Sequence, residues 1–552
     1  MANNLAEHAF EAAWTRSQLE LRYLGVTPQS VHRFQELLSY MLYPNARFRP
    51  SGERLSRNEL NQQGLWSMGI SGDLPILCVA VADETALPLV RETLAAHTYW
   101  RMQGFRADLV LLNQEGAAYD QPVRQLLLQA AQAHSLHTGL DTPGGVFLRD
   151  WHTLSEPQRH LLLAASHVVL NGARGRLARQ LSALPGTVAA PVPDRRPMPA
   201  GEFPPGDLPF LELDYFNGIG GFSRTEREYC IYLDGTKTTP RPWVNVIAGP
   251  QFGTIVSESG LGHTWYGNSQ SNRITPWRND PVSDAPSEAL YLRDEESGAV
   301  WSPTAQPCRD TAPYRARHGM GYTVFEHNHL GWEQELSVFV PAWRKQQGMA
   351  FDSVKICLLR VRNSSGRART IRLFGYAEWV LGANREDSQL HVRTWLHEAS
   401  GAVLAQGPWS AHYGTRVAFA GMSPQPDSYT CDRASFLGRN RHYGDPAGVR
   451  LAELDRRIGP GLDPCAALTS AQSIGPGETG VFLFLLGQGA DREECARLLE
   501  YYGSAHAAFR AESSTREAWQ ATLSPLTVRT PVHSVNLLLN GWLLYQSLSC
   551  RF

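Results

Sequence analysis

The hydrophobic pattern of the N-terminal third has helical spacing first and then alternates between strands and helices. Over residues 5–42 apolar side chains recur at helical spacing, and Gly25–Pro28 interrupts them, which predicts two helices. Residues 75–82, 107–113 and 144–150 are short apolar runs typical of strands, and helical segments separate them. This order predicts a small α/β unit with parallel strand pairing.

The pattern changes at Leu211 to short runs that are broken by Gly, Pro, Asn and Asp, and it continues so to about Leu486. Several runs alternate apolar and polar positions, which indicates antiparallel strands with one wet face. About 15 or more such runs over this length favour a large two-sheet sandwich over a small barrel. Helical character returns at Asp491–Thr522, and a last apolar helix is predicted at Pro531–Phe552. The predicted fold class is therefore α+β and multidomain, with a large antiparallel β-sandwich at its centre.

These changes of pattern suggest five segments. Residues 187–209 are rich in proline and have little apolar periodicity, which predicts a semi-rigid linker. The segments are a helical plus small α/β domain (1–186), this linker (187–209), the β-sandwich (210–488), linker helices (489–530) and the last helix (531–552).

Length and charge restrict the class of protein. At 552 residues the chain exceeds a single core. Lys and Arg (51) nearly balance Asp and Glu (53), without a long block of like charge, so we expect neither nucleic acid nor an anionic membrane as a partner. The longest apolar run, Leu74–Ala82, is too short to span a bilayer, and the N-terminus lacks the pattern of a signal peptide. We expect a soluble, cytoplasmic chain.

Cysteine and histidine patterns do not predict a metal site. None of the eight cysteines lies in a C-x-x-C pair, so scattered reduced thiols are expected. His318, His327 and His329 lie close to Glu326 in the sequence, but strand alternation directs His327 and His329 to one face and Glu326 to the other. A metal ion would need further ligands from elsewhere in the chain. We therefore expect no metal and no cofactor.

Aromatic and planar polar side chains gather between Phe216 and Cys308 more densely than anywhere else in the chain. Such side chains suit sugars, because aromatic faces stack on C–H groups while Asp, Asn and Arg pair with hydroxyls. The alternative interpretation is that aromatics at a period of two are cross-strand pairs of a sandwich.

Several long motifs of this stretch resemble a known family. FNGIGGFS, then YGNSQSNRITPWRNDPVSD, then YLRDEESGAVWSP, resemble the N-terminal β-domain of family 94 glycoside phosphorylases such as cellobiose and chitobiose phosphorylases. The resemblance extends upstream through LWSMGISGDLPI and downstream through FEHNHLGWEQELSVFVP to NGWLLYQSLSCRF. Over this whole length the chain resembles in particular the C-terminal region of cyclic β-1,2-glucan synthases.

The resemblance implies a glycosyltransferase or inverting phosphorylase acting on β-glucans, with inorganic phosphate as co-substrate. In such enzymes one carboxylic acid protonates the leaving oxygen while phosphate attacks from the opposite face. By resemblance that acid is an Asp in an (α/α)6 barrel, of which residues 531–552 form the first helix. We therefore expect a fragment with no catalytic residue of its own. The expected partners are a β-glucan or oligosaccharide, the helical catalytic domain and a second copy in a homodimer. The resemblance also implies a parent protein that other domains attach to the inner membrane.

The motif SNRITPWRNDPVSD supplies the candidate sugar-contacting residues. Trp277 would stack on a sugar face, and Arg273 or Arg278 would pair with hydroxyls or phosphate. The alternative is a loop held by Arg–Asp pairs and a packed Trp. Asp280 and Asp284 are expected to form turns rather than an acid–base pair. The candidates are Arg273, Trp277, Arg278, Asn279, Asp280 and Asp284.

Three function classes remain open from the sequence. The first is the β-sandwich portion of a glucan-active enzyme, which shapes the sugar-binding cleft. The second is a carbohydrate-binding or assembly module without turnover. The third is an independent hydrolase that uses carboxylates of the sandwich.

Overall fold

A computed structural model gives the fold as two compact units, residues 1–189 and 190–552, which are described separately. The predicted linker lies largely outside the described residues. The described residues are 2–116, 121–182, 203, 206–224, 227–280, 282–346, 348–438 and 440–552.

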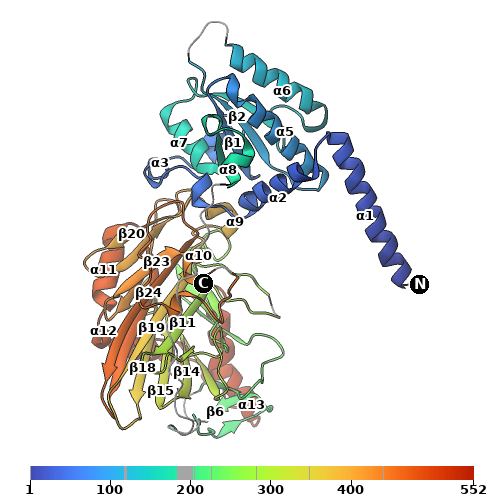
Figure 1. Cartoon of the computed structure of the whole chain (residues 1–552). Coiled ribbons are helices and arrows are strands. Elements are labelled where there is room, and N and C mark those ends of the chain that lie inside the picture. Colours follow the sequence, from blue (N-terminus) through green and yellow to red (C-terminus); the bar gives the residue numbers. More distant parts are fainter. Residues whose placement is uncertain are drawn as a thin grey trace. The chain divides into compact units, whose positions relative to one another are not determined.

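The first unit is built on a four-stranded parallel sheet in the order β3-β2-β1-β4 (blue to cyan in Figure 1). Every residue of the two central strands is buried, as expected when a parallel sheet is covered on both faces. The parallel α/β pattern predicted from the sequence is thus present. The elements are β1 (Ile76–Val81), β2 (Asp108–Asn113), β3 (Val146–Asp150), β4 (Ser166–Asn171), α5 (Leu87–Met102), α6 (Pro122–Thr138), α7 (Glu156–Ala165) and α8 (Leu177–Ser182).

The two predicted N-terminal helices are α1 (Ala2–Leu24) and α2 (Pro28–Leu42). Helix α2 begins where expected because the Thr27 hydroxyl accepts from the backbone N–H of Ser30. The sequence pattern did not predict α7 or β4. Helix α7 ends at Ala165 and β4 begins at Ser166, so no turn residue separates their apolar runs.

The second unit is a sandwich of an 11-stranded and a five-stranded sheet, with a further three-stranded sheet, all antiparallel (green to orange in Figure 1). In spatial order the large sheet comprises β20 (Arg393–His397), β21 (Ala402–Gln406), β22 (Val417–Ser423), β25 (Thr479–Gly489), β18 (Val354–Asn363), β15 (Trp332–Phe339), β14 (Tyr322–His329), β13 (Tyr314–Gly319), β7 (Tyr229–Leu233), β6 (Gly220–Ser223) and β5 (Leu213–Asp214).

The smaller sheets complete the sandwich. The five-stranded sheet comprises β12 (Val300–Trp301), β11 (Glu288–Asp294), β19 (Arg369–Glu378), β24 (Pro464–Ile474) and β23 (Ser428–Asp432). The three-stranded sheet comprises β10 (Gly262–Tyr266), β9 (Phe252–Ser257) and β8 (Val244–Ala248), and β16 (Ala342–Arg344) pairs with β17 (Met349–Phe351).

The main core lies between the large and the five-stranded sheet. Leu336, Leu359 and Phe484 of the large sheet pack with Leu292 and Leu373 of the smaller one. The neighbouring positions on β15, β18 and β25 face outward, because successive side chains of a strand point to opposite faces.

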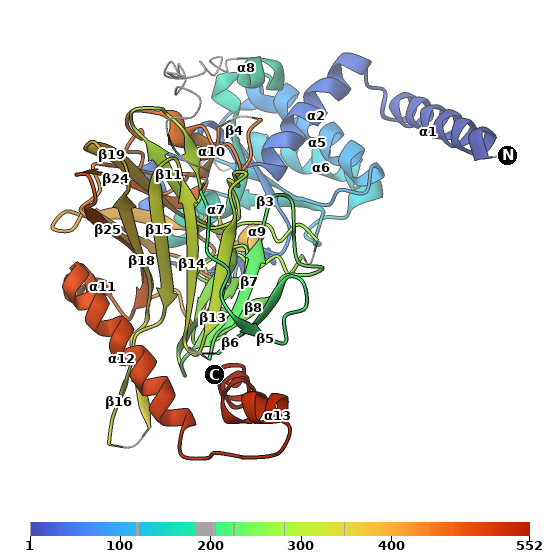
Figure 2. The same ribbon diagram turned by 90° about the horizontal axis from the view of Figure 1, so that it is seen from below.

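Two helices cover the outer face of the large sheet, as Figure 2 shows for α11 (Arg492–Tyr502) and α12 (Ala505–Leu523). Leu499 and Tyr502 of α11 pack with Phe419 and Leu485 of the sheet. The sequence predicted linker helices here, and the second of them begins after Ser504, which caps the N-terminus of α12.

The last helical segment contains α13 (His533–Leu537), a π-helical turn (Leu538–Trp542) and α14 (Leu543–Ser549). The apolar helix predicted at Pro531–Phe552 is thus helical over most of its length. Only one face packs: the buried Tyr545 hydroxyl lies 2.9 Å from Asn245 Oδ1 and 2.8 Å from Val246 O. Leu539 and Leu543 on the other side are exposed, because one helix lying against a sheet buries only the stripe that faces it.

The eight cysteines all lie within the described residues and are free thiols, seven of them at least partly buried. Along the described parts of the chain, no helix combines the length and the apolarity that crossing a membrane requires.

Strand β11 carries a buried carboxylate at each end. Asp294 Oδ2 accepts from Arg369 at 2.6 Å, and both side chains are 0% exposed. Trp332 of the opposite sheet also donates to this oxygen, at 3.1 Å. At the other end, Glu288 pairs with Lys355 of β18 in the opposite sheet. Both carboxylates therefore link the two layers of the sandwich.

Asp294→Asn should destabilise the sandwich strongly, because it leaves the Arg369 charge buried without a counter-charge. We expect a loss of about 3–5 kcal/mol in the free energy of unfolding. The matched control is Glu333→Gln, which breaks an exposed pair with Arg362 (3.1 Å) and should cost less than about 1 kcal/mol. Urea unfolding followed by tryptophan fluorescence measures both. Equal shifts for the two variants would contradict the role assigned to Asp294.

Candidate carbohydrate-binding site

The segment between β10 and β11 presents an exposed tryptophan on a buried support. Trp277 is 40% exposed, and its ring lies parallel to that of His263, with 4.9 Å between centroids and 2° between planes. His263 itself is buried in β10. The Arg273 guanidinium lies 6.0 Å from the Trp277 ring centroid. Trp277 thus has a fixed orientation and an accessible surface, as stacking on a sugar requires.

The segment is tied to the core before Trp277. Buried Asn272 donates to Gln488 Oε1 of β25 at 2.9 Å, and the Arg273 backbone N–H donates to Gly382 O at 2.8 Å. Just beyond, the buried Thr275 hydroxyl donates to Glu288 at 2.6 Å. These contacts explain why a segment without regular secondary structure keeps Trp277 in one place.

The segment after Trp277 is a tight turn that contains the candidate residues Asp280 and Asp284. Asp280 Oδ1 accepts from the backbone N–H of Val282 (2.9 Å) and of Ser283 (3.2 Å). Asn279 and Asp284 have positive φ angles of 48° and 41°, which Asn and Asp tolerate better than most residues. Asp280 therefore forms a turn, as the sequence predicted.

The Asp284 carboxylate points into the protein. Its Oδ2 accepts from Ser257 Oγ at 2.7 Å and from Ser259 Oγ at 3.0 Å. Burial raises the pKa of Asp284, and the two serine hydrogen bonds oppose that rise. Both Asp280 and Asp284 thus have local partners, and the geometry does not pair them as acid and base.

Arg278 meets a buried carboxylate that the sequence did not connect with it. The exposed Arg278 guanidinium lies 3.6 Å from Oε1 of Glu378, which is fully buried at the end of β19. Glu378 also contacts Arg385 at 2.6 Å and Arg433 at 3.3 Å, and Tyr443 donates to it at 2.5 Å.

This arginine cluster, defined as Arg278, Arg385 and Arg433, carries an excess of positive charge. Arg385 and Arg433 also pair with Asp463, so within the described residues three guanidinium groups face two carboxylates and one positive charge remains. Arg385 begins α9 (Arg385–Ser388) and Arg433 begins α10 (Arg433–Leu437). Sequence reasoning missed both because they lie more than a hundred residues from Arg278, and no motif marks them.

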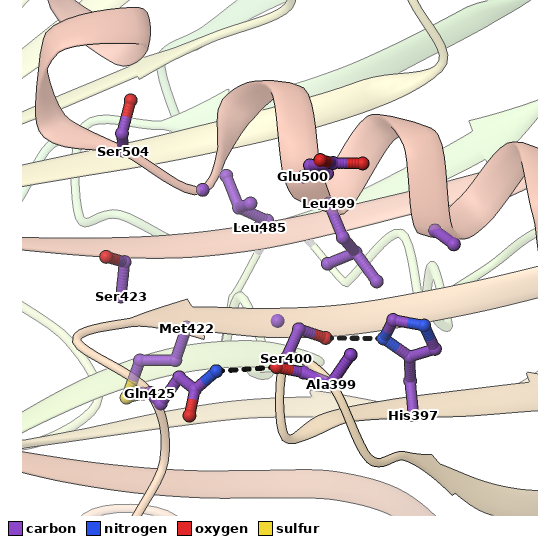
Figure 3. A pocket seen from close by; sticks show the side chains of 13 residues that line it. His397, Ala399, Ser400, Met422, Ser423, Gln425, Leu485, Leu499, Glu500 and Ser504 are labelled. Carbon is purple, nitrogen blue, oxygen red and sulfur yellow. Dashed lines mark hydrogen bonds between the residues drawn. The ribbon is translucent and has the colours of Figure 1, made fainter.

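A separate cavity of about 620 Å³ lies between the β20–β21 turn, β22, β25 and α11 (Figure 3). His397 and Ser400 are hydrogen-bonded at 2.8 Å, and Gln425 donates to Ala399 O at 2.7 Å. The volume is within the range of ligand pockets. However, no Trp, Tyr or Phe is among the described residues that line it, so it lacks the planar apolar face that Trp277 offers to a sugar.

Comparisons with known proteins identify the family. Residues 227–505 match the model of "Glycosyl hydrolase 94, supersandwich domain", which is just over half of the chain. The chain therefore belongs to glycosyl hydrolase family 94, a family of carbohydrate-active proteins. This confirms the predicted resemblance and the large antiparallel sandwich of the α+β fold.

Two curated relatives and one solved structure show the extent of the similarity. The chain is 33% identical to cyclic β-(1,2)-glucan synthase NdvB of Rhizobium meliloti (strain 1021), over 99% of this chain and 19% of the synthase. It is 28% identical to N,N'-diacetylchitobiose phosphorylase of Vibrio proteolyticus, over 60% of this chain and 41% of the phosphorylase. The match to a solved structure described as "Putative kojibiose phosphorylase from human microbiome" covers 59% of this chain and 42% of that one, with 9% identity and a TM-score of 0.35. The chain thus spans less than half the length of these relatives.

His263, which lies beneath Trp277, should make the free energy of unfolding depend on pH. Burial lowers the pKa of His263 to about 4, and neither ring nitrogen has a hydrogen-bond partner among the described residues. An unfolded histidine titrates near its ordinary pKa of about 6.5. The unfolded state therefore binds the extra proton first, and stability falls as the pH drops from about 6.5 to 4, by about 3 kcal/mol for this one group.

His263→Phe should remove this contribution while retaining a ring beneath Trp277. We expect the variant to lose less stability than the wild type between pH 6.5 and 4. Chemical unfolding at several pH values measures the difference, with His412→Ala, at an exposed position, as the control. Parallel pH profiles for His263→Phe and the wild type would contradict the prediction.

Proposed function

We propose that this chain supplies the sugar-binding β-domain of a family 94 enzyme that acts on β-glucans. The observation that carries the proposal is the exposed Trp277 ring, which rests on buried His263 and is followed directly by Arg278 of the arginine cluster. The ring offers a flat apolar face to the C–H groups of a sugar. Arg278 offers planar donors to hydroxyl groups or to a phosphate.

The charge balance of the arginine cluster supports a polar or anionic ligand. Arg278 is about half exposed, and its ion pair with Glu378 is long, at 3.6 Å. Its exposed donors can reach a sugar hydroxyl or the inorganic phosphate that a phosphorylase uses. Arg385 and Arg433 are less exposed and hold Glu378 in place.

We infer that the acid catalyst is supplied by a helical catalytic domain of the family 94 type rather than by this loop. Inverting glycoside chemistry needs a carboxylic acid that can reach the leaving oxygen. Asp280 and Asp284 are instead engaged in their own turn and with serines. Exposed Leu539 and Leu543 of the last helical segment offer that domain an apolar contact surface.

The glucan linkage is proposed from the relatives. The similarity to the cyclic β-(1,2)-glucan synthase covers both units of this chain, whereas the similarity to the chitobiose phosphorylase covers 60% of it. A β-1,2-linked glucan is therefore the substrate class that we propose. The role of the chain is to shape the cleft in which that glucan lies.

Trp277→Ala should weaken binding of linear β-1,2-glucan by at least about tenfold, or about 1.4 kcal/mol, because the stacking surface is lost. Trp277→Phe should retain most of the affinity. Calorimetry measures both, and Trp14→Ala removes an exposed tryptophan from α1 as the matched control. Equal affinities of the Trp277→Ala and Trp14→Ala variants would contradict the proposed site.

The purified chain should bind glucan without turning it over. We expect no sugar 1-phosphate from β-1,2-glucan, sophorose or cellobiose in the presence of inorganic phosphate, because Asp280 and Asp284 are held by their own partners and cannot protonate the leaving oxygen. A coupled assay for sugar 1-phosphate measures this. Turnover by these 552 residues would overturn the inference and return the search for the acid to Asp280, Asp284 and Asp294.

A further inference from the structure

Three side chains that can ligate a metal converge at the open end of the β13–β14 hairpin, away from its turn. His327 and His329 lie two residues apart on β14 and share a face. Asp310 lies in the segment before β13, and it reaches them because Tyr314 pairs with His327 across the hairpin. Asp310 Oδ2 is 2.7 Å from His327 Nε2 and 3.0 Å from His329 Nδ1.

His318 and Glu326, which are close to these histidines in the sequence, do not join them in space. His318 contacts Thr323 Oγ1 and Trp243 O, each at 3.0 Å, near the other end of the hairpin. Glu326 points to the opposite face, where it pairs with Arg315 and Arg317, as strand alternation predicted. The sequence predicted no metal site, because the two histidines need a further ligand from elsewhere in the chain. Asp310, which lies 17 residues before His327, brings such a group to them.

The hydrogen bond at the far side of the His327 ring defines which atom is available to a metal. His327 Nδ1 lies 2.9 Å from Pro313 O, and a carbonyl oxygen can only accept, so Nδ1 carries the proton. In a neutral ring Nε2 then directs a lone pair at the Asp310 carboxylate, which also offers lone pairs. A second proton on Nε2, or a metal ion between the two atoms, resolves this conflict. Metal-binding histidines commonly donate their other ring N–H to a backbone carbonyl, as His327 does to Pro313.

The surroundings hold the three groups in place and leave one side open. The His327 ring stacks on Tyr314, with 3.7 Å between centroids, and its side chain is fully buried. The His329 ring contacts buried Trp301. The backbone N–H of Ala312 donates to Asp310 Oδ1 at 2.6 Å. The side chains of His329 and Asp310 retain 22% and 14% exposure, which gives an ion access from solvent.

We propose that Asp310, His327 and His329 form a binding site for a divalent transition metal ion, with Zn²⁺ as the preferred ion. Two imidazoles and one carboxylate are a donor set that Zn²⁺ favours, and a solvent molecule completes the tetrahedron on the open side. Bonds of about 2.0–2.1 Å require ligand atoms about 3.3 Å apart. The three ligand atoms lie within 4.8 Å of one another, so they reach this spacing on binding as the two Asp310 contacts lengthen. The ion then fastens the segment before β13 to β14.

Zn²⁺ titration of the chain without a polyhistidine tag, after removal of metals by a chelator, tests the proposal. We expect one ion per chain by calorimetry and a higher melting temperature with Zn²⁺, since binding to the folded state stabilises it. Co²⁺ in place of Zn²⁺ should give visible absorption bands without a thiolate charge-transfer band. A thiolate band would instead place the ion on a cysteine such as the exposed Cys550 and overturn the proposal.

Two ligand variants and one control separate this site from adventitious binding. His329→Gln and Asp310→Asn should each lower the affinity for Zn²⁺ by about tenfold or more, and His412→Ala should leave it unchanged. Melting temperatures of the metal-free proteins show whether each variant is folded. Absence of saturable binding to the wild type, or wild-type affinity in the two folded ligand variants, would overturn the proposal. The measured quantity is metal binding, so the outcome is independent of the proposed glucan binding.

Discussion

The sandwich depends on two buried carboxylates at the ends of β11. Asp294 forms an ion pair with Arg369 and accepts a hydrogen bond from the Trp332 indole of the opposite sheet. Glu288 forms an ion pair with Lys355 of that sheet. A buried charge that loses its partner is costly, so each carboxylate favours the one arrangement of the layers in which its partner faces it. Hydrophobic packing drives the layers together, but it is non-directional and would tolerate a shift that these pairs do not.

The same constraint positions the candidate site. Glu288 also accepts from the hydroxyls of Thr264 and Thr275, and Thr275 lies two residues before Trp277. A third buried carboxylate, Glu378, gathers the arginine cluster at the end of β19. The exposed groups that we propose to contact sugar are therefore supported by charges inside the sandwich. Such support is what keeps a binding surface preorganised when it lies on a loop.

The candidate site was only partly visible in the sequence. The density of aromatic and planar side chains directed attention to residues 273–284, where Trp277 and Arg278 do reach the surface. The Asp280 carboxylate instead stabilises the turn, and the Asp284 carboxylate points inward to Ser257. The groups that complete the surroundings, such as His263 and Arg433, come from other strands and helices. Their relation to Trp277 follows from long-range pairing, which local periodicity does not contain.

The types of element and the class of fold could be predicted from the sequence alone, because helices and strands follow local spacing of apolar residues. The sequence also predicted that Glu326 and His327 point to opposite faces. The order of the strands, the partial exposure of Leu543 and the contact of Asp310 with His327 became apparent only in the folded chain. These features depend on which distant segments pack together, and that choice is made by the burial of charge and apolar surface across the whole sandwich.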